Sequence, residues 1–142
     1  AFHVASEWAF LNANEGGAGS RDAKFNGGYI EAGWFITGET KTLKPSKGAW
    51  DRPGVNNPVQ AGGLGALQIA AKYDRIDLTG AGVYGGEQDT VILGVNWYLN
   101  RYTRVTANYS HSSIKKAFDV AANGTDGANA VDAYGLRLQI DF

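Results

Sequence analysis

The stretch Tyr134-Gly-Leu-Arg-Leu-Gln-Ile-Asp-Phe142 decides the fold class of this chain. An apolar or aromatic residue stands at every second position from Tyr134 to Phe142, and none of the residues between them is large and apolar. Because alternate side chains of a β-strand point to opposite faces, the stretch predicts a strand with one apolar face and one polar face. In a helix the same apolar residues would scatter around the axis and would bury poorly.

The predicted strand ends on an aromatic residue, which is typical of the carboxyl-terminal strand of an outer-membrane β-barrel. The barrel-assembly machinery reads such a strand, and we expect the signal to consist of Tyr134, Leu136, Leu138, Ile140 and Phe142. If so, Phe142 marks the periplasmic side. A soluble β-sandwich can also end on a half-buried strand, so that alternative stays open.

The composition favours strands over helices. The 142 residues are 44% hydrophobic and 12% aromatic, with 20 glycines and 3 prolines. No apolar run reaches the roughly 18 residues that a transmembrane helix needs, but a barrel with a polar lumen is not excluded by this. The net charge of −1 argues against a general nucleic-acid binder. The lack of cysteine excludes a disulfide scaffold and a Cys-ligated metal site.

Alternation of apolar and polar residues recurs along the chain between Gly-, Asn- and Asp-rich segments. It predicts antiparallel strands at residues 2–11, 28–37, 66–78, 89–99, 103–113 and 134–142. Their length of about ten residues is that of a tilted membrane strand, whereas soluble strands more often have about five or six residues. Tryptophan and tyrosine on the apolar faces suit the aromatic girdles of a membrane barrel.

Six strands cannot close a membrane barrel, because open sheet edges leave backbone groups unpaired in lipid. Since about eight strands are the practical minimum, we expect residues 1–142 to be the carboxyl-terminal part of a single, larger barrel domain. The chain has no initiator methionine, so we expect Ala1 to be a processed or truncated start.

Counting strands back from Phe142 assigns each connection to one side of the membrane. The count makes 100–102 a short periplasmic turn and predicts external loops at 14–24, 79–88 and 119–129. It also places the long connection 38–65 on the periplasmic side. A connection of this length is unusual unless it has a function or packs into a cavity.

The long connection carries four cations, with Glu39 and Asp51 nearby. One interpretation is an anion-attracting segment that dips into the lumen, where a low-dielectric channel focuses its charge. The other is a solvated periplasmic turn. The residues concerned are Lys41, Lys44, Lys47 and Arg52.

Three further cations, Lys72, Arg104 and Arg137, fall on the predicted polar faces. They could form a basic ladder along a pore wall. The alternative that we favour is a set of ion pairs within the wall, each of which contributes little. Its candidate partners are Glu7, Asp74, Asp89 and Asp141.

Catalysis and metal binding have little support in the sequence. His111 is followed by Ser112, but neighbours on a strand face opposite ways, so adjacency does not make them a base–nucleophile pair. The spacing of Asp119, Asp126 and Asp132 does not match a calcium-binding loop, which favours a solvated loop. We therefore expect no enzyme activity, no metal and no cofactor.

Several phrases, taken in order, resemble the phosphate- and polyphosphate-selective porin family of Gram-negative bacteria. They are residues 33–39 (GWFITGE), 65–73 (GALQIAAKY) with 76–78 (IDL), 93–100 (LGVNWYLN) and 136–142 (LRLQIDF). The resemblance covers nearly the whole chain. It implies a homotrimeric outer-membrane porin of about sixteen strands, of which these are the last six. It also implies a pore constricted by inward segments that passes small anions such as phosphate, with membrane lipid and lipopolysaccharide around it.

Three functions therefore compete. The leading interpretation is a diffusion porin that prefers anions. The second is a small structural or adhesive barrel without a conducting lumen. The third, a soluble β-sandwich that binds a ligand, must explain the long strands with aromatic ends.

Overall fold

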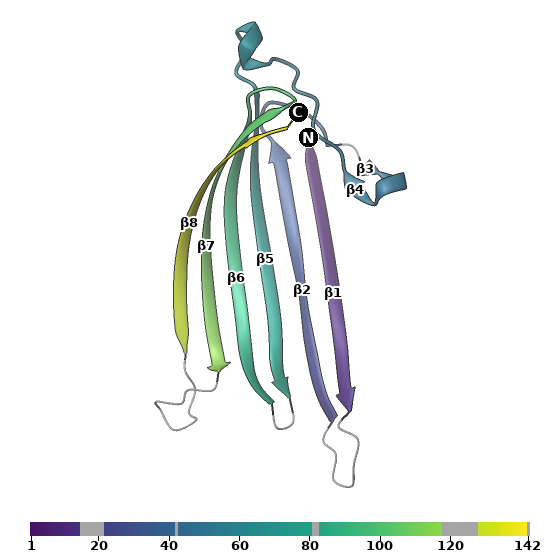
Figure 1. Ribbon diagram of the computed structural model, residues 1–142, viewed down its shortest axis with the longest axis vertical. Helices are drawn as coiled ribbons and strands as arrows, with labels where there is room; N and C mark the ends of the chain where they lie inside the picture. The colour runs from purple at the N-terminus through teal and green to yellow at the C-terminus, as the bar shows by residue number, and fades with distance from the viewer. Residues whose placement is uncertain (15–21, 42, 81–82, 118–127, 142) are drawn as a thin grey trace.

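The computed structural model describes residues 1–14, 22–41, 43–80, 83–117 and 128–141. Within these ranges, long strands form one six-stranded antiparallel sheet in the order β1-β2-β5-β6-β7-β8 (Figure 1). Each long strand therefore pairs with the next one along the chain. The strands are β1 (Phe2–Asn14), β2 (Asp22–Phe35), β5 (Ala66–Gly80), β6 (Val83–Tyr98), β7 (Thr103–Ala117) and β8 (Asn129–Ile140). The prediction of an all-β, antiparallel fold is confirmed, and the sheet is open, with β1 and β8 at its edges.

The strands are longer than predicted. They run from 12 residues in β8 to 16 residues in β6, and the extra residues lie at the hairpin ends. The bounds predicted for the external loop at 79–88 are wrong, because 79–80 belong to β5 and 83–88 belong to β6. The loop predicted at 14–24 is wrong at both its ends for the same reason. Most of the loop predicted at 119–129 lies outside the described residues.

The two faces of the sheet differ as the alternation predicts. On β6, Val91, Leu93 and Val95 point to one face and are exposed, whereas Thr90 on the other face is buried. The pairing register keeps the faces aligned, since Leu93 lies opposite Ala71 on one side and Tyr109 on the other. We call the two surfaces the apolar face and the polar face.

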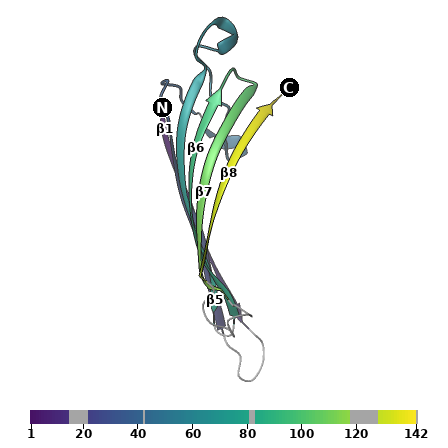
Figure 2. The same ribbon diagram turned by 90° about the vertical axis from the view of Figure 1, so that its left-hand side faces the viewer.

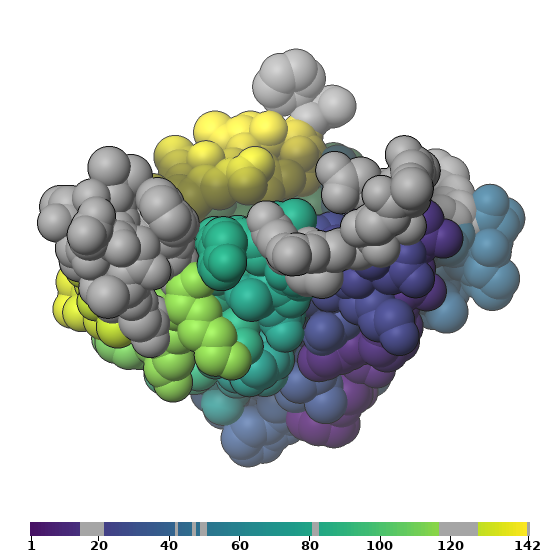
Figure 3. Space-filling model, turned by 90° about the horizontal axis from the view of Figure 1, so that it is seen from below, coloured from purple at the N-terminus to yellow at the C-terminus, as the bar shows by residue number. Residues whose placement is uncertain are grey.

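No second layer covers the apolar face in the described part of the chain. The exposed large apolar side chains on it range in exposure from 37% for Tyr73 to 83% for Tyr134. Seen from the side the sheet is a single twisted layer (Figure 2), and from the hairpin end the strands follow one another from purple β1 toward yellow β8 (Figure 3). Monomeric soluble proteins rarely expose a contiguous apolar face, and such a face marks contact with another protein surface or with a membrane. No helix among the described residues is long and apolar enough to cross a membrane.

The connection between β2 and β5, residues 36–65, has its own short elements at the end of the sheet where both chain termini lie (Figure 1). A two-stranded sheet forms between β3 (Leu43–Lys44) and β4 (Ala49–Trp50), with the 3-10 turn η1 (Pro45–Lys47) between them. A second 3-10 turn, η2 (Val59–Ala61), precedes β5. The hairpin ends of the long strands lie at the opposite end of the molecule.

Candidate functional site

The polar face carries a chain of uncharged hydrogen-bonding side chains across three strands. Gln68 is 2% exposed, and its Oε1 accepts hydrogen bonds from Asn96 Nδ2 at 3.2 Å and from the Tyr98 hydroxyl at 3.4 Å. The Thr106 hydroxyl donates to Asn96 Oδ1 at 2.9 Å, which extends the chain to β7. These contacts fix a wall of donors and acceptors that resembles the wet lining of a channel more than a packed core.

The connection 36–65 packs against this polar face at its non-hairpin end. Phe35, Ala66 and Tyr98 are buried together, and Val55 of the connection packs on them. The rings of Phe35 and Tyr98 lie 5.8 Å apart between centroids. Because Phe35 and Tyr98 point to the polar face, this small apolar cluster holds the connection over that face.

Lys41 lies at the meeting point of two recesses on the polar face. One, of about 240 Å³, is also lined by His3, Lys72 and Asn96. The other, of about 250 Å³, is also lined by Arg104. The pKa of Lys41 is lowered because burial disfavours its charged form; Glu31 opposes the shift, and the positive charge of Arg104 adds to it. The connection thus brings a lysine against the sheet wall.

The side chain of Arg104 contacts uncharged partners. Its Nη2 donates to Gln139 Oε1 at 2.7 Å, and its Nη1 donates to the Tyr98 hydroxyl at 3.3 Å. The guanidinium also lies over the Tyr98 ring, 5.5 Å from its centroid. Neither Arg104 nor Lys41 forms a salt bridge with a carboxylate of the described residues. Both can therefore present positive charge to a solute.

Other cations predicted for the site are paired with carboxylates. Lys44 Nζ lies 2.8 Å from Asp51, and Arg52 Nη2 lies 3.3 Å from Asp141. Lys72 Nζ lies 3.0 Å from Asp74 and 4.4 Å from the centroid of the Tyr29 ring. The pairing of Lys72 with Asp74 is the one that the ion-pair interpretation predicts.

The last two predicted cations are Arg137 and Lys47. Arg137 lies on the polar face, opposite Thr106 in the pairing register. Lys47 ends the turn η1, and its side chain lies outside the described structure.

Asp89 does not lie on the polar face, so its predicted role as an ion-pair partner of the cations there is wrong. It lies opposite Arg75 in the register, on the same face as Tyr73, because odd positions of β5 and β6 face together. It accepts hydrogen bonds from the Tyr73 hydroxyl at 2.5 Å and from Arg75 Nη1 at 3.2 Å. Arg75 also pairs with Glu87 at 3.3 Å. Polar and charged side chains therefore replace the apolar ones on this face near the hairpin end.

The histidine beside the serines also belongs to the apolar face. His111 Nδ1 lies 2.8 Å from Asp132 Oδ1, which also accepts a hydrogen bond from the Tyr109 hydroxyl at 2.6 Å. Ser112 faces the other way, with its Oγ 2.9 Å from the Thr90 hydroxyl. His111 and Ser112 therefore point to opposite faces, as predicted for neighbouring residues of a strand, and do not form a base–nucleophile pair. Among the described residues, no group of His, Cys, Asp and Glu is arranged to hold a metal ion.

The strand with the predicted assembly signal presents its apolar residues to the surroundings. Four of them are 59–83% exposed: Tyr134, Leu136, Leu138 and Ile140. The Tyr134 ring lies 5.2 Å from that of Tyr109 on β7. Phe142 lies outside the described residues.

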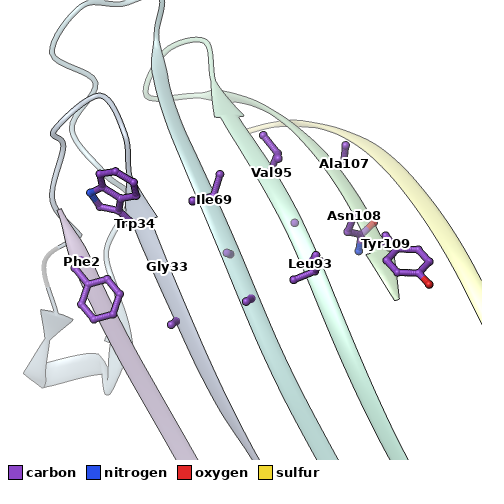
Figure 4. A pocket seen from close by; sticks show the side chains of 13 residues that line it. Phe2, Gly33, Trp34, Ile69, Leu93, Val95, Ala107, Asn108 and Tyr109 are labelled. Carbon is purple, nitrogen blue, oxygen red and sulfur yellow. The ribbon is translucent and has the colours of Figure 1, made fainter. Parts of the chain in front are cut away.

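A shallow groove of about 760 Å³ crosses the apolar face, with small residues in its floor and large ones at its rim. Phe2 and Trp34 stand at one side of it, and Tyr109 stands at the other (Figure 4). Alanines at positions 32, 71 and 107 make the floor. The alternation of residues does not reveal this groove, because only the pairing of strands brings its lining residues together. It does not reveal the burial of Gln68 and Glu39 either.

Comparison with known proteins complements this geometry. The family model described as phosphate-selective porin O and P matches residues 1–142. An uncharacterized protein of Caulobacter vibrioides is 35% identical over 141 residues, which are 99% of this chain and 27% of that protein. Porin O of Pseudomonas aeruginosa is 26% identical over 131 residues, which are 86% of this chain and 28% of that protein. The chain thus spans about a quarter of the length of these curated relatives.

Proposed function

The chain belongs to the phosphate-selective porin O and P family, and from this premise we propose that it is part of the wall of an outer-membrane porin. The resemblance carried by its sequence phrases is thereby confirmed. The longer protein that would contain this chain, which we call the parent protein, would be a single barrel of about sixteen strands, a number typical of porins. Small anions, including phosphate, would diffuse through its water-filled lumen along the polar face.

A slanted boundary of the apolar face carries the proposal of a membrane-spanning wall. On β8 the apolar run ends at Tyr134, and Asp132 follows on the same face toward the hairpin end. On β1 the corresponding positions, which are apolar except for Ser6, continue to Phe10, which is 77% exposed. When the paired residues are followed from strand to strand across the sheet, however, Tyr134 on β8 is level with Val4 on β1 and not with Phe10. The intermediate partners are Tyr109, Leu93, Ala71 and Ala32.

The boundary therefore moves six residues along the strands, from the level of Val4 to Phe10, over five steps from β8 to β1. With about 3.3 Å per residue and about 4.8 Å between strands, this slant equals a strand tilt of about 40°. Strands of membrane barrels are tilted by about 35–45°. A flat bilayer boundary drawn across such tilted strands accounts for the slant, whereas a soluble sandwich has no reason to show it.

Anion preference is proposed to arise at Lys41 and Arg104, with Arg137 contributing on the same face. Lys44, Arg52 and Lys72 contribute less, because each lies beside a carboxylate that offsets its charge. A low-dielectric wall focuses the field of the remaining cations into the lumen and raises the local concentration of anions.

The surroundings of the barrel follow from the same proposal. The apolar face would contact membrane lipid, and its hairpin end would meet lipopolysaccharide. The barrel-assembly machinery would read β8, and the parent protein would be a homotrimer, as the family resemblance implies. We propose neither a cofactor nor an enzymatic activity.

Planar-bilayer recordings of the full-length parent protein test the anion preference. Under a salt gradient, the wild type should give a reversal potential with the sign of an anion-preferring channel. Replacing both Lys41→Gln and Arg104→Gln should move that potential toward zero. The matched control, Lys44→Gln with Asp51→Asn, removes an ion pair and should change it little. Absence of channels in the wild type, or an unchanged potential in the double variant, would contradict the proposal.

A further inference from the structure

The connection 36–65 is tied together at its base by hydrogen bonds that centre on a buried carboxylate. Glu39 is 3% exposed. One of its oxygens accepts a hydrogen bond from the Thr37 hydroxyl, and the other accepts one from the Asn56 backbone N–H at 3.4 Å. Thr37 Oγ1 in turn accepts a hydrogen bond from the Leu67 backbone N–H at 2.9 Å. The chain of contacts thus runs from β5 through Thr37 and Glu39 to Asn56.

This chain joins parts of the backbone that are distant in sequence. Thr37 lies two residues after the end of β2, Leu67 lies at the start of β5, and Asn56 lies in the second arm of the connection. A buried carboxylate is costly unless hydrogen bonds satisfy it, so the arrangement holds only when the donors stay in place. Loss of the carboxylate would leave the Asn56 N–H without this acceptor. Glu39 therefore specifies how the two arms of the connection meet.

The position of Lys41 depends on this junction. Lys41 follows Glu39 by two residues, so fixing Glu39 fixes where the chain enters the recess. On the other arm, Val55 packs on the buried cluster of Phe35, Ala66 and Tyr98. Glu39 thus stands between the sheet and Lys41, while it touches neither recess that Lys41 borders.

We propose that Glu39 is a positioning residue, which holds the connection against the polar face so that Lys41 stays beside Arg104. The proposal rests on the proposed channel function and adds to it the residue that keeps the cation in place. Glu39 itself need not meet the solute. Its hydrogen-bonded carboxylate, rather than its charge, is what matters for selectivity.

The sign of the effect separates positioning from simple electrostatics. If Glu39 acted only through its negative charge, its removal would strengthen the preference for anions. If Glu39 acts by positioning, its removal releases the connection, moves Lys41 away and weakens the preference. Thr37→Val breaks the same chain of hydrogen bonds without changing any charge, so electrostatics alone predicts no effect for it.

The experiment compares Thr37→Val, Thr37→Ser, Glu39→Ala and Lys41→Gln with the wild type, in the full-length parent protein in planar bilayers. We expect Thr37→Val and Glu39→Ala to lower the anion-to-cation permeability ratio about twofold, toward that of Lys41→Gln, because the focused charge leaves the path. Single-channel conductance should rise as the recess opens. Thr37→Ser keeps the hydroxyl and should behave as the wild type. Unchanged ratios in Thr37→Val, or a raised ratio in Glu39→Ala, would overturn the proposal.

A distance measurement keeps the two proposals separable. Spin labels at positions 46 and 101, both exposed and outside the Glu39 contacts, report how the connection sits on the sheet. The distance distribution between them should be narrow in the otherwise unchanged protein and broader with Thr37→Val. If the distribution broadens but the wild type does not conduct, Glu39 positions the connection and the channel proposal fails. If the wild type conducts with anion preference and the distribution stays narrow in Thr37→Val, the Glu39 proposal fails alone.

Discussion

Lys41 and Arg104 border the same recess on the polar face, although Lys41 belongs to the connection 36–65 and Arg104 to β7. Burial chiefly lowers the pKa of Lys41; Glu31 counteracts the shift, and the positive charge of Arg104 reinforces it. An anion that entered the recess would meet two cations that lack a salt bridge to a described carboxylate.

The lowered pKa of Lys41 predicts an alkaline loss of selectivity. Below its pKa Lys41 is charged and attracts anions; above it Lys41 is neutral, so the preference for anions falls as the pH rises. The fall should begin below the pH expected of an ordinary lysine, whose pKa is about 10.4. Reversal potentials recorded between neutral and alkaline pH measure it. Lys41→Arg stays charged throughout, so an identical pH profile in this variant would rule out Lys41 as the titrating group.

Gly65 should be intolerant of a side chain. Its φ is +77°, and an added Cβ would lie 2.4 Å from the Tyr98 carbonyl oxygen. We expect Gly65→Ala to destabilise the barrel by about 1–3 kcal/mol, because it combines a left-handed backbone with a backbone clash. The matched control is Gly54→Ala, where an added Cβ meets nothing within 4 Å. Urea unfolding of the parent protein in lipid measures both, and equal stabilities would contradict the packing described for β5 and β6.

A charge placed on the apolar face should be costly, whereas one on the polar face should not. Leu93 is 51% exposed on the apolar face, and Asn96 points to the polar face of the same strand. Leu93→Arg should destabilise the inserted protein by about 2–4 kcal/mol if its position lies near the bilayer midplane. Asn96→Arg should fold with nearly normal yield. Comparable folding yields in lipid vesicles for the two variants would argue against the assignment of the faces.

The slanted boundary predicts the depths of residues on the two edge strands. A spin label at Phe10 should lie at the same depth in the bilayer as one at Tyr134, although the register aligns Tyr134 with Val4. A label at Val4 should lie deeper than both. Relaxation by oxygen and by a water-soluble nickel complex gives each depth. Equal depth of the Val4 and Tyr134 labels would mean that the strands are not tilted as proposed.

The alternation of residues predicted the strands and their faces well, because it reflects a sheet with one apolar and one polar surface. It failed at the hairpin ends, where glycines were interpreted as turn signals. The second predicted strand began at Gly28, whereas β2 begins six residues earlier at Asp22, and an added Cβ at Gly28 would come within 2.2 Å of the Trp8 ring. The glycine makes room for a cross-strand aromatic side chain. Sequence patterns do not distinguish that use of glycine from a turn.

The candidate site was less predictable than the fold. The cations of the connection are visible in the sequence, but their partners are not. Lys44 and Asp51 meet only because β3 and β4 pair, and Arg52 meets Asp141 only because the connection reaches β8. Lys41 reaches Arg104 because Val55 and Glu39 fix the connection on the polar face. These contacts depend on the course of an irregular segment, which has no periodic signal.

We propose that this sheet separates lipid from water, with the apolar face in the bilayer and the polar face along an aqueous path. Spin labels placed one at a time at positions 91–96 of β6, in the full-length parent protein in lipid vesicles, test it most directly. Labels at 91, 93 and 95 should be reached by oxygen and not by a water-soluble nickel complex, and labels at 92, 94 and 96 should show the reverse. Uniform access to the nickel complex would indicate a soluble sheet, and its exclusion from both faces would indicate a barrel without a conducting lumen; either result would contradict the account.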